Sequence, residues 1–267
     1  MTESNTTSFG HGIVTLASDD EGMVGEVRMH WPERRNALSL QMIAALTDAF
    51  HYAGESELRG IVLAADGPVF SAGHDFSDMA GSDIALLRRL FESCTDMMNL
   101  IQSVPQPVIA MVHGLATAAG CQLVATCDLA VASEQAGFAI PGGKGGLFCH
   151  TPSVALARNI GRKRLFEMAF TGDVIDAATA LDWGLVNRVV PHDTLESATR
   201  ALLGRAIRGS AFSKAIGKTV LYRQIGLNQP DAYRVAAAEM AAAATSHDAQ
   251  EGMASFLEKR EPKWQNR

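Results

Sequence analysis

The 267-residue sequence is poor in several kinds of residue, and each shortage excludes a class of protein. It holds only four cysteines, and no two of them form a CxxC pair; they are Cys94, Cys121, Cys127 and Cys149. This predicts buried free thiols rather than a disulfide framework or a cysteine metal site. No metal is expected. Reduced thiols fit a reducing compartment, and the polar first residues do not resemble a signal peptide, so the expected location is the cytoplasm.

Basic residues and long apolar runs are also scarce. Lys and Arg number 23 against 29 Asp and Glu, which gives a net charge of −6. A surface of that charge does not favour nucleic acid or anionic membranes as partners. No window approaches the ~18 apolar residues of a transmembrane helix. With 47% hydrophobic residues, the chain is long enough for one large α/β domain with a sizeable core.

Short apolar runs alternate with helical patterns in the first half of the chain. The predicted strands cover residues 12–17, 25–30, 60–65, 107–112, 128–133 and 137–140. Ser39 is a predicted N-cap for a helix over 40–53, and 82–102 has apolar side chains at helical spacing. After residue 140 the sequence is typical of helices, interrupted by a strand at 187–190. The pattern predicts an α/β fold with a β/α core over 1–200 and a helical region over 201–267.

Small residues follow two of the predicted strands. "PVFSAGHDF" (68–76) and "GLATAAGCQL" (114–123) both occur where a strand gives way to a helix. The first N–H groups of a helix lack partners, so two such groups facing one cavity would form an oxyanion hole. The alternative is that Gly73, Ala118, Ala119 and Gly120 only permit tight packing of helix on strand. Spacing alone leaves both interpretations open.

These segments, taken together, resemble one known family. "ERRNALS" (33–39), "FSAGHDF" (70–76), the segment 106–133, "FAIPGGKGGL" (138–147) and the segment 170–190 occur in the order and spacing of the crotonase, or enoyl-CoA hydratase/isomerase, superfamily. The "GLFCHTP" stretch (146–152) is similar to a hydratase-domain-containing subgroup that lacks the catalytic glutamates. The resemblance implies a crotonase-like (ClpP/crotonase) β-β-α superhelix with a helical C-terminal region. It also implies a homotrimer or a dimer of trimers.

The resemblance further implies an acyl-CoA thioester as substrate, in fatty acid metabolism, and no cofactor apart from the coenzyme A of that substrate. Its two catalytic amides correspond to the backbone N–H groups of His74 and Ala119, which would hold the thioester oxygen and stabilise an enolate. Arg34, Arg35 and Lys259 are the cations expected near the coenzyme A phosphates. The implied substrate-binding residues are Arg35, Ala37, Ala72, Asp75, Phe76, Leu115, Gly120, Gln122, Pro141 and Gly142.

The sequence departs from the family at both acid–base positions. The two glutamates that add water across the double bond in hydratases correspond here to Gln122 and Gly142. An amide cannot exchange a proton at useful pH, and glycine has no side chain. Since positioned acid–base groups contribute ~10²–10⁴-fold each, we expect weak hydratase activity from this chain.

Three functions therefore stay open. The first is a lyase or isomerase that uses other acid–base residues. The second is a decarboxylase-type enzyme in which the His74 ring contacts the leaving carboxylate, since "SAGHD" also occurs in the methylmalonyl-CoA decarboxylase branch. The third is an acyl-CoA-binding protein with little turnover.

Three further residues have expected roles. Asp75 is expected either to cap the next helix or to act as a base. Cys149 and His150 are expected to pack in the interior or to line the pocket.

Overall fold

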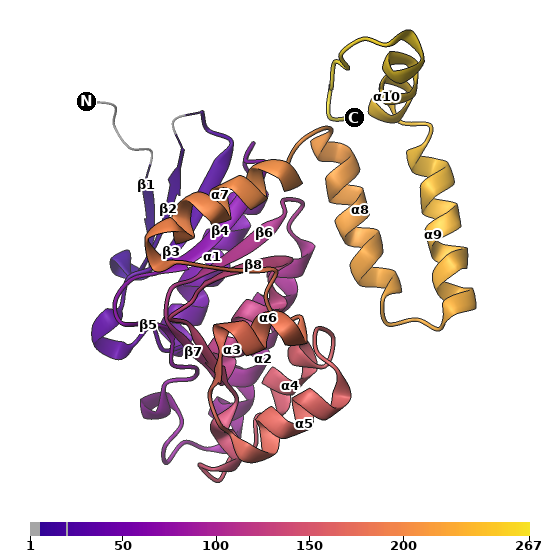
Figure 1. The fold of residues 1–267 in the computed structure, drawn as a ribbon. Helices are drawn as coiled ribbons and strands as arrows, with labels where there is room; N and C mark the ends of the chain where they lie inside the picture. The colour runs from indigo at the N-terminus through magenta and orange to yellow at the C-terminus, as the bar shows by residue number, and fades with distance from the viewer. Residues whose placement is uncertain (1–5, 20) are drawn as a thin grey trace.

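The computed structural model describes residues 6–19 and 21–267, in which eleven strands and ten α-helices form (Figure 1). The strands are β1 (Thr6–Phe9), β2 (Val14–Ser18), β3 (Val24–Met29), β4 (Gly60–Ala65), β5 (Val69–Ser71), β6 (Val108–Val112), β7 (Leu115–Thr117), β8 (Leu129–Ser133), β9 (Gly137–Ala139), β10 (Ile175–Asp176) and β11 (Arg188–Val190). The α-helices are α1 (Leu40–Gly54), α2 (Ile84–Ser103), α3 (Ala119–Thr126), α4 (His150–Leu156), α5 (Arg162–Thr171), α6 (Ala177–Trp183), α7 (Leu195–Ala206), α8 (Ala211–Gln224), α9 (Gln229–Ala243) and α10 (His247–Glu258). Five 3₁₀ helices join them: η1 (Gly10–Gly12), η2 (Pro32–Arg34), η3 (Phe76–Asp78), η4 (Pro141–Gly143) and η5 (His192–Thr194).

Seven strands form the main sheet, in the order β1-β2-β3-β4-β6-β8-β11. Strands β1 to β3 pair antiparallel, and from β3 to β11 every pair is parallel. The α/β class is confirmed, and the predicted strands are observed with ends within two residues. Strand β1 was not predicted, because its sequence "TTSF" is polar and neither face of it is fully buried.

Helices cover the main sheet on both faces, and β4 shows how its sequence permits this. Along β4, Ile61 and Leu63 belong to the larger apolar core with α1 and α2, whereas Val62 and Ala64 belong to a second core with Leu203 of α7. Successive side chains of a strand point to opposite faces, so a strand covered on both sides is apolar at every position. This accounts for the uninterrupted apolar run "GIVLAA" of β4, which is buried on both faces.

Four shorter strands form a second sheet in the order β10-β9-β7-β5. Strands β5, β7 and β9 run parallel to one another, and β10 pairs antiparallel with β9. Since parallel strands end at the same edge, the segments that follow β5, β7 and β9 emerge side by side. Those segments contain three of the motifs on which the family resemblance rests.

The predicted N-cap of the first long helix is confirmed. The Ser39 hydroxyl accepts a hydrogen bond from Met42 N at 3.1 Å, and α1 begins at the next residue. Asp83 caps α2 in the same way through Leu86 N. Both caps fix where the chain leaves the loops that precede α1 and α2, and the loop before α1 enters the candidate site described below.

Helices α8, α9 and α10 extend away from the two sheets as an arm, with α8 and α9 antiparallel and α10 at its end (Figure 1). Residue 200, the expected boundary of the helical region, falls inside α7. Helix α7 buries Leu195 and Leu203 against the main sheet and is therefore part of the core. Among the described residues no helix is long and apolar enough to span a bilayer.

An ion pair between a buried lysine and a half-buried aspartate holds the arm against the core. Lys218 of α8 is 8% exposed; its Nζ lies 2.7 Å from Asp128 Oδ2 and donates to the carbonyls of Ile101 and Gln106, each at 2.9 Å. The Tyr222 hydroxyl donates to Asp128 Oδ1 at 2.8 Å. Burial lowers the pKa of Lys218, and the nearby Asp128 opposes that shift. All three ammonium protons have acceptors, as a buried cation requires.

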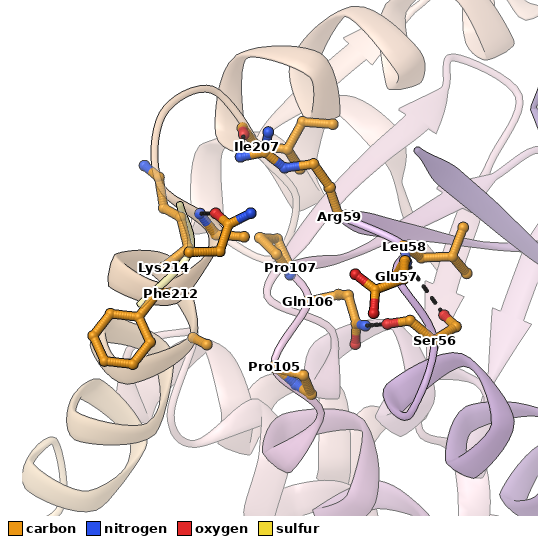
Figure 2. A pocket seen from close by; sticks show the side chains of 13 residues that line it. Ser56, Glu57, Leu58, Arg59, Pro105, Gln106, Pro107, Ile207, Phe212 and Lys214 are labelled. Carbon is orange, nitrogen blue, oxygen red and sulfur yellow. Dashed lines mark hydrogen bonds between the residues drawn. The ribbon is translucent and has the colours of Figure 1, made fainter. Parts of the chain in front are cut away.

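A cavity of about 250 Å³ lies beside this junction, between the loop before β4, the loop before β6 and the start of α8 (Figure 2). Arg59 crosses it and donates from Nη2 to the carbonyls of Ile207, at 3.0 Å, and Gly209. Gln106 donates from Nε2 to Ala53 O at 3.0 Å. None of the residues expected to bind substrate lines this cavity. These contacts tie the α7–α8 linker to the sheet.

Lys218→Met is expected to lower the free energy of unfolding by ~1–3 kcal/mol, because it leaves the half-buried Asp128 carboxylate without its cation and two carbonyls without their donor. Lys214→Met, an exposed residue one turn earlier on α8, is the matched control and should change it by less than ~0.5 kcal/mol. Chemical denaturation of both variants measures the difference. Equal stabilities of the two variants would show that the pair does not hold the arm.

Candidate active site

The candidate site forms where β5, β7 and β9 end. Residues 72–76 follow β5, 118–122 follow β7 and 140–142 follow β9. Parallel pairing of β5 with β7 and of β7 with β9 brings these three segments to one edge of the second sheet. Ligands of α/β proteins bind at such carboxyl edges, where backbone groups are still unpaired.

A fourth segment, residues 35–38, runs beside the chain that follows β5. Ala72 N donates to Arg35 O at 3.0 Å, and Leu38 N donates to Gly73 O at 2.7 Å. Arg35 has a left-handed backbone with φ of 53°, which turns its side chain away from the sheet into an exposed position. The two motifs "ERRNALS" and "FSAGHDF" are therefore hydrogen-bonded to each other.

A pocket of about 490 Å³ opens over these two segments. Its lining includes six of the residues expected at the site, and Glu33 and Arg34 beside them; the six are Arg35, Ala37, Ala72, His74, Asp75 and Phe76. Phe76 is 77% exposed and stands at the rim. The remaining expected residues, on β7, α3 and η4, do not line this pocket.

The loops after β5 and β7 are in direct contact because their residues are small. A Cβ placed on Gly73, whose φ is +84°, would lie 2.8 Å from Ala118 Cβ and 3.1 Å from Ala119 N. A Cβ on Gly120 would collide with the Ser71 carbonyl. The small residues therefore permit tight packing of the two loops, and they also bring the backbone at Gly73 close to Ala119 N.

Two backbone N–H groups at this contact have no acceptor. His74 N and Ala119 N donate no hydrogen bond to any of the residues that the structure describes. Ala119 is the first residue of α3, where such a donor has no intrahelical partner. Ala118, which precedes it, has φ of 51° and ψ of −119°, a strained backbone for a residue with a Cβ. Strain of this kind persists only where the surrounding structure imposes it.

Asp75 caps a helix and binds an arginine. Its side chain accepts from Ser77 N at 2.9 Å at the start of η3, which is the capping alternative expected from the sequence. Arg34 donates to Asp75 Oδ2 from Nε at 2.9 Å and from Nη2 at 2.5 Å, and its guanidinium lies 5.3 Å from the Trp31 ring centroid. Burial opposes ionisation, but the bonds from Ser77 and Arg34 leave the Asp75 pKa lowered. Asp75 therefore stays an anion, and Arg34 is held by it.

The His74 side chain turns toward α2. Its Nδ1 lies 3.1 Å from Leu38 O, and its ring meets Phe91 edge to face at 5.2 Å. Since a carbonyl only accepts, Nδ1 carries the proton in this contact. Nε2 is buried and has no partner in the described structure. Burial lowers the pKa of His74, with the Leu38 bond and the charge of Asp78 opposing it, so the imidazole is neutral at neutral pH.

Gln122, at one of the two glutamate positions, lies one turn into α3. It is 5% exposed, and its Oε1 is buried with no hydrogen-bond partner among the described residues. Buried polar atoms in proteins nearly always have partners. Next to it, Cys121 is fully buried and burial raises the pKa of its thiol to about 12. All four cysteines are free and buried, as predicted.

Gly142, at the other glutamate position, has no room for any side chain. A Cβ there would collide with Leu147 O and lie 2.7 Å from Cys149 Sγ. Two hydrogen bonds close the turn, from Leu147 N to Gly142 O at 3.0 Å and from Gly142 N to Cys149 Sγ at 3.3 Å. Burial raises the pKa of Cys149, so its thiol stays protonated. The expected packing role of Cys149 is observed, and its sulfur fills the space beside residue 142.

Other expected residues lie further apart. Leu115 is at the start of β7, four residues before Ala119, and Pro141 begins η4. Lys259 is the C-cap of α10, and within one chain α10 lies on the arm, away from β5 (Figure 1). In residues 6–19 and 21–267 no three His, Cys, Asp or Glu side chains lie close enough to hold a metal ion.

Two residues that support the site were not predicted. Asn36 is fully buried with φ of 48°, and its amide donates to Asp66 O at 2.7 Å and to Val69 O at 3.1 Å. Ser71 donates from its hydroxyl to Asn36 O at 2.8 Å. The only signal in the sequence is the preference of Asn for left-handed turns, which does not reveal a partner 30 residues away.

Residues 19–267 match the family model described as enoyl-CoA hydratase/isomerase. Enoyl-CoA hydratase domain-containing protein 3 of Xenopus laevis is 42% identical over 265 residues, covering 98% of this chain and 89% of that protein. The human protein of that name is 44% identical, covering 87% of this chain and 78% of its own length. Both are named as mitochondrial.

Solved structures agree with this match. An enoyl-CoA hydratase of Mycobacterium smegmatis superimposes with a TM-score of 0.91 at 45% identity, covering 94% of this chain and 98% of its own. Human enoyl-CoA hydratase domain-containing protein 3 superimposes with a TM-score of 0.90 at 40% identity, covering 94% of this chain and 100% of its own. The chain belongs to the enoyl-CoA hydratase/isomerase family. The crotonase-like fold and the likeness to the hydratase-domain-containing subgroup are thereby confirmed.

Gly142→Ala is expected to lower the free energy of unfolding by ~1–3 kcal/mol, because its methyl group meets the Leu147 carbonyl. Gly145→Ala, in the same turn, is the matched control, since a Cβ there has its nearest neighbour at 3.6 Å. Thermal and chemical denaturation compare the two. Equal free energies of unfolding for the two variants would mean that the turn can accommodate a side chain at residue 142, which contradicts the prediction.

Proposed function

We propose that this chain binds an acyl-CoA thioester with its carbonyl oxygen between His74 N and Ala119 N, and stabilises the enolate formed beside that carbonyl. The observation that carries the proposal is the pair of N–H groups without acceptors at one contact between two loops. Donors that are already oriented stabilise a developing oxyanion by about 3–4 kcal/mol each. Membership of the enoyl-CoA hydratase/isomerase family supports an acyl-CoA as the ligand.

The pocket over residues 33–37 and 72–76 supports a binding place for the coenzyme A portion. Arg35 is exposed in it without a carboxylate partner in the described structure and is the cation best suited to a phosphate. Arg34 is engaged by Asp75, so its contribution to phosphate binding would require that pair to open. No further cofactor is proposed, since enolate stabilisation by amides needs none.

The reaction class is that of a lyase or isomerase with weak water addition. Gln122 cannot accept a proton, and the turn around Gly142 excludes a second carboxylate. The same two observations favour the second candidate, an acyl-CoA-binding protein with little turnover. Product formation from a panel of acyl-CoA thioesters separates the two candidates.

We further propose assembly as a trimer or a dimer of trimers. The arm exposes large apolar side chains, and contiguous exposed apolar surface marks protein interfaces; among them are Leu221 (59%), Tyr233 (68%), Met240 (76%), Phe256 (83%) and Leu257 (79%). The cytoplasmic location stays a prediction, and the vertebrate relatives are named mitochondrial. Light scattering measures the oligomeric state, and fractionation of the source cells tests the location.

The infrared carbonyl stretch of bound butyryl-CoA labelled with ¹³C at the thioester should shift to lower frequency than in water, because two N–H donors polarise it. Gly73→Ala should abolish the shift, since its Cβ would push Ala119 N away. Gly145→Ala should retain it. An unshifted stretch in the unmodified protein would refute the oxyanion hole.

Hydration of crotonyl-CoA should be at least ~10²-fold slower than with a family enzyme that carries both glutamates, because neither of the two glutamate positions carries a group that transfers protons here. Gln122→Glu alone should not restore the rate, since the second position stays closed. Absorbance loss of the enoyl thioester measures both. Ordinary hydratase rates in the unmodified chain would contradict the role assigned to the missing glutamates.

A further inference from the structure

We propose that the His74 imidazole acts through Nε2 as the proton acceptor for the α-carbon of the bound acyl group. This inference rests on the proposed function, because it takes the thioester to be held by the His74 and Ala119 amides. It assigns to one histidine the proton transfer for which the glutamate positions offer no group.

The first observation is the tautomer. Nδ1 faces the Leu38 carbonyl at 3.1 Å and must donate there, so the neutral ring leaves a lone pair on Nε2. The ring is fixed by this bond on one side and by the Phe91 edge at 5.2 Å on the other. A carbonyl that orients a histidine and leaves its other nitrogen bare is the arrangement that a general base requires.

The second observation is that Nε2 is buried and has no hydrogen-bond partner among the residues that the structure describes, and the same holds for the Gln122 amide oxygen one turn into α3. His74 follows Gly73 in the loop after β5, and Gln122 lies in the first turn of α3, whose first residue, Ala119, meets Gly73. A ligand that presents an oxygen to the two amides and a C–H or O–H to the two acceptors would satisfy all four groups. His74 also lines the pocket over residues 33–37 and 72–76.

The proton transfer balances without a co-reactant. Nε2 takes the α-proton, and the electron pair of the C–H bond forms the enolate, whose oxygen lies between the two amides. If the acyl chain carries a 3-hydroxyl, the C–O bond then breaks with its electron pair on oxygen. The imidazolium returns its proton to that oxygen, and water leaves from an enoyl thioester.

The same geometry distinguishes substrate classes. Nε2 presents a lone pair, which repels the carboxylate of a malonyl-type thioester, and burial disfavours the imidazolium that would attract it. The assigned proton transfer therefore favours acyl thioesters that carry no carboxylate on the α-carbon. Decarboxylation with His74 as a carboxylate contact is not favoured.

The test is exchange of the α-protons of butyryl-CoA with D₂O, followed by NMR, because this substrate undergoes no elimination. The unmodified chain should catalyse exchange, and His74→Phe, which keeps a ring against Phe91, should lose it by at least ~10²-fold while still binding butyryl-CoA. His74→Gln, which can still donate to Leu38 O, should behave in the same way and covers the case in which the phenylalanine variant does not fold. His51→Phe, on the exposed side of α1, should exchange at the unmodified rate.

Calorimetric binding of butyryl-CoA is measured on every variant. Exchange that persists in both His74 variants overturns the inference. Binding without exchange in the unmodified chain also overturns it and leaves the proposed acyl-CoA function intact. Failure of the unmodified chain to bind any acyl-CoA overturns both.

Discussion

The contact between the loops that follow β5 and β7 is the constraint on which the rest of the site depends. Parallel pairing of the two strands brings the loops to one edge, and glycine at position 73 and alanines at 118 and 119 let the backbones touch. Ala118, with φ of 51°, precedes the first amide of α3, which finds no acceptor in residues 6–19 and 21–267. Hydrogen bonds from Asn36 and Ser71 hold the adjoining segments together and compensate for this local strain.

The polar groups around that contact form two sets, one with hydrogen-bond partners and one without them in the described structure. Arg34, Asp75 and Ser77 satisfy one another and shape the rim of the pocket. The amides of His74 and Ala119, together with His74 Nε2 and Gln122 Oε1, remain unpaired in the described structure. Because unpaired buried groups are costly, these four groups are the basis on which we propose a ligand site here rather than ordinary packing.

Much of the fold could be predicted from the sequence because the main strands are buried on both faces or alternate clearly. Residues 60–65 were predicted with their observed ends, and the Ser39 cap was identified from its residue type alone. Short strands such as β5, β7 and β10 have two or three residues and carry no periodicity of their own. Asn36 and the Leu38–His74 bond depend on contacts across more than 30 residues, which local patterns do not encode. The candidate site positions came from the family resemblance, whereas the closed turn at Gly142 became visible only in three dimensions.

That closed turn has a consequence for the relation between this chain and the hydratases of its family. Its hydrogen bonds run between residues 142, 147 and 149, so the space for a carboxylate is taken by backbone and sulfur rather than by one replaceable side chain. Exchange of a single amino acid cannot convert one kind of active site into the other. An evolutionary or engineered route between them has to replace the segment from Pro141 to Cys149 as a whole.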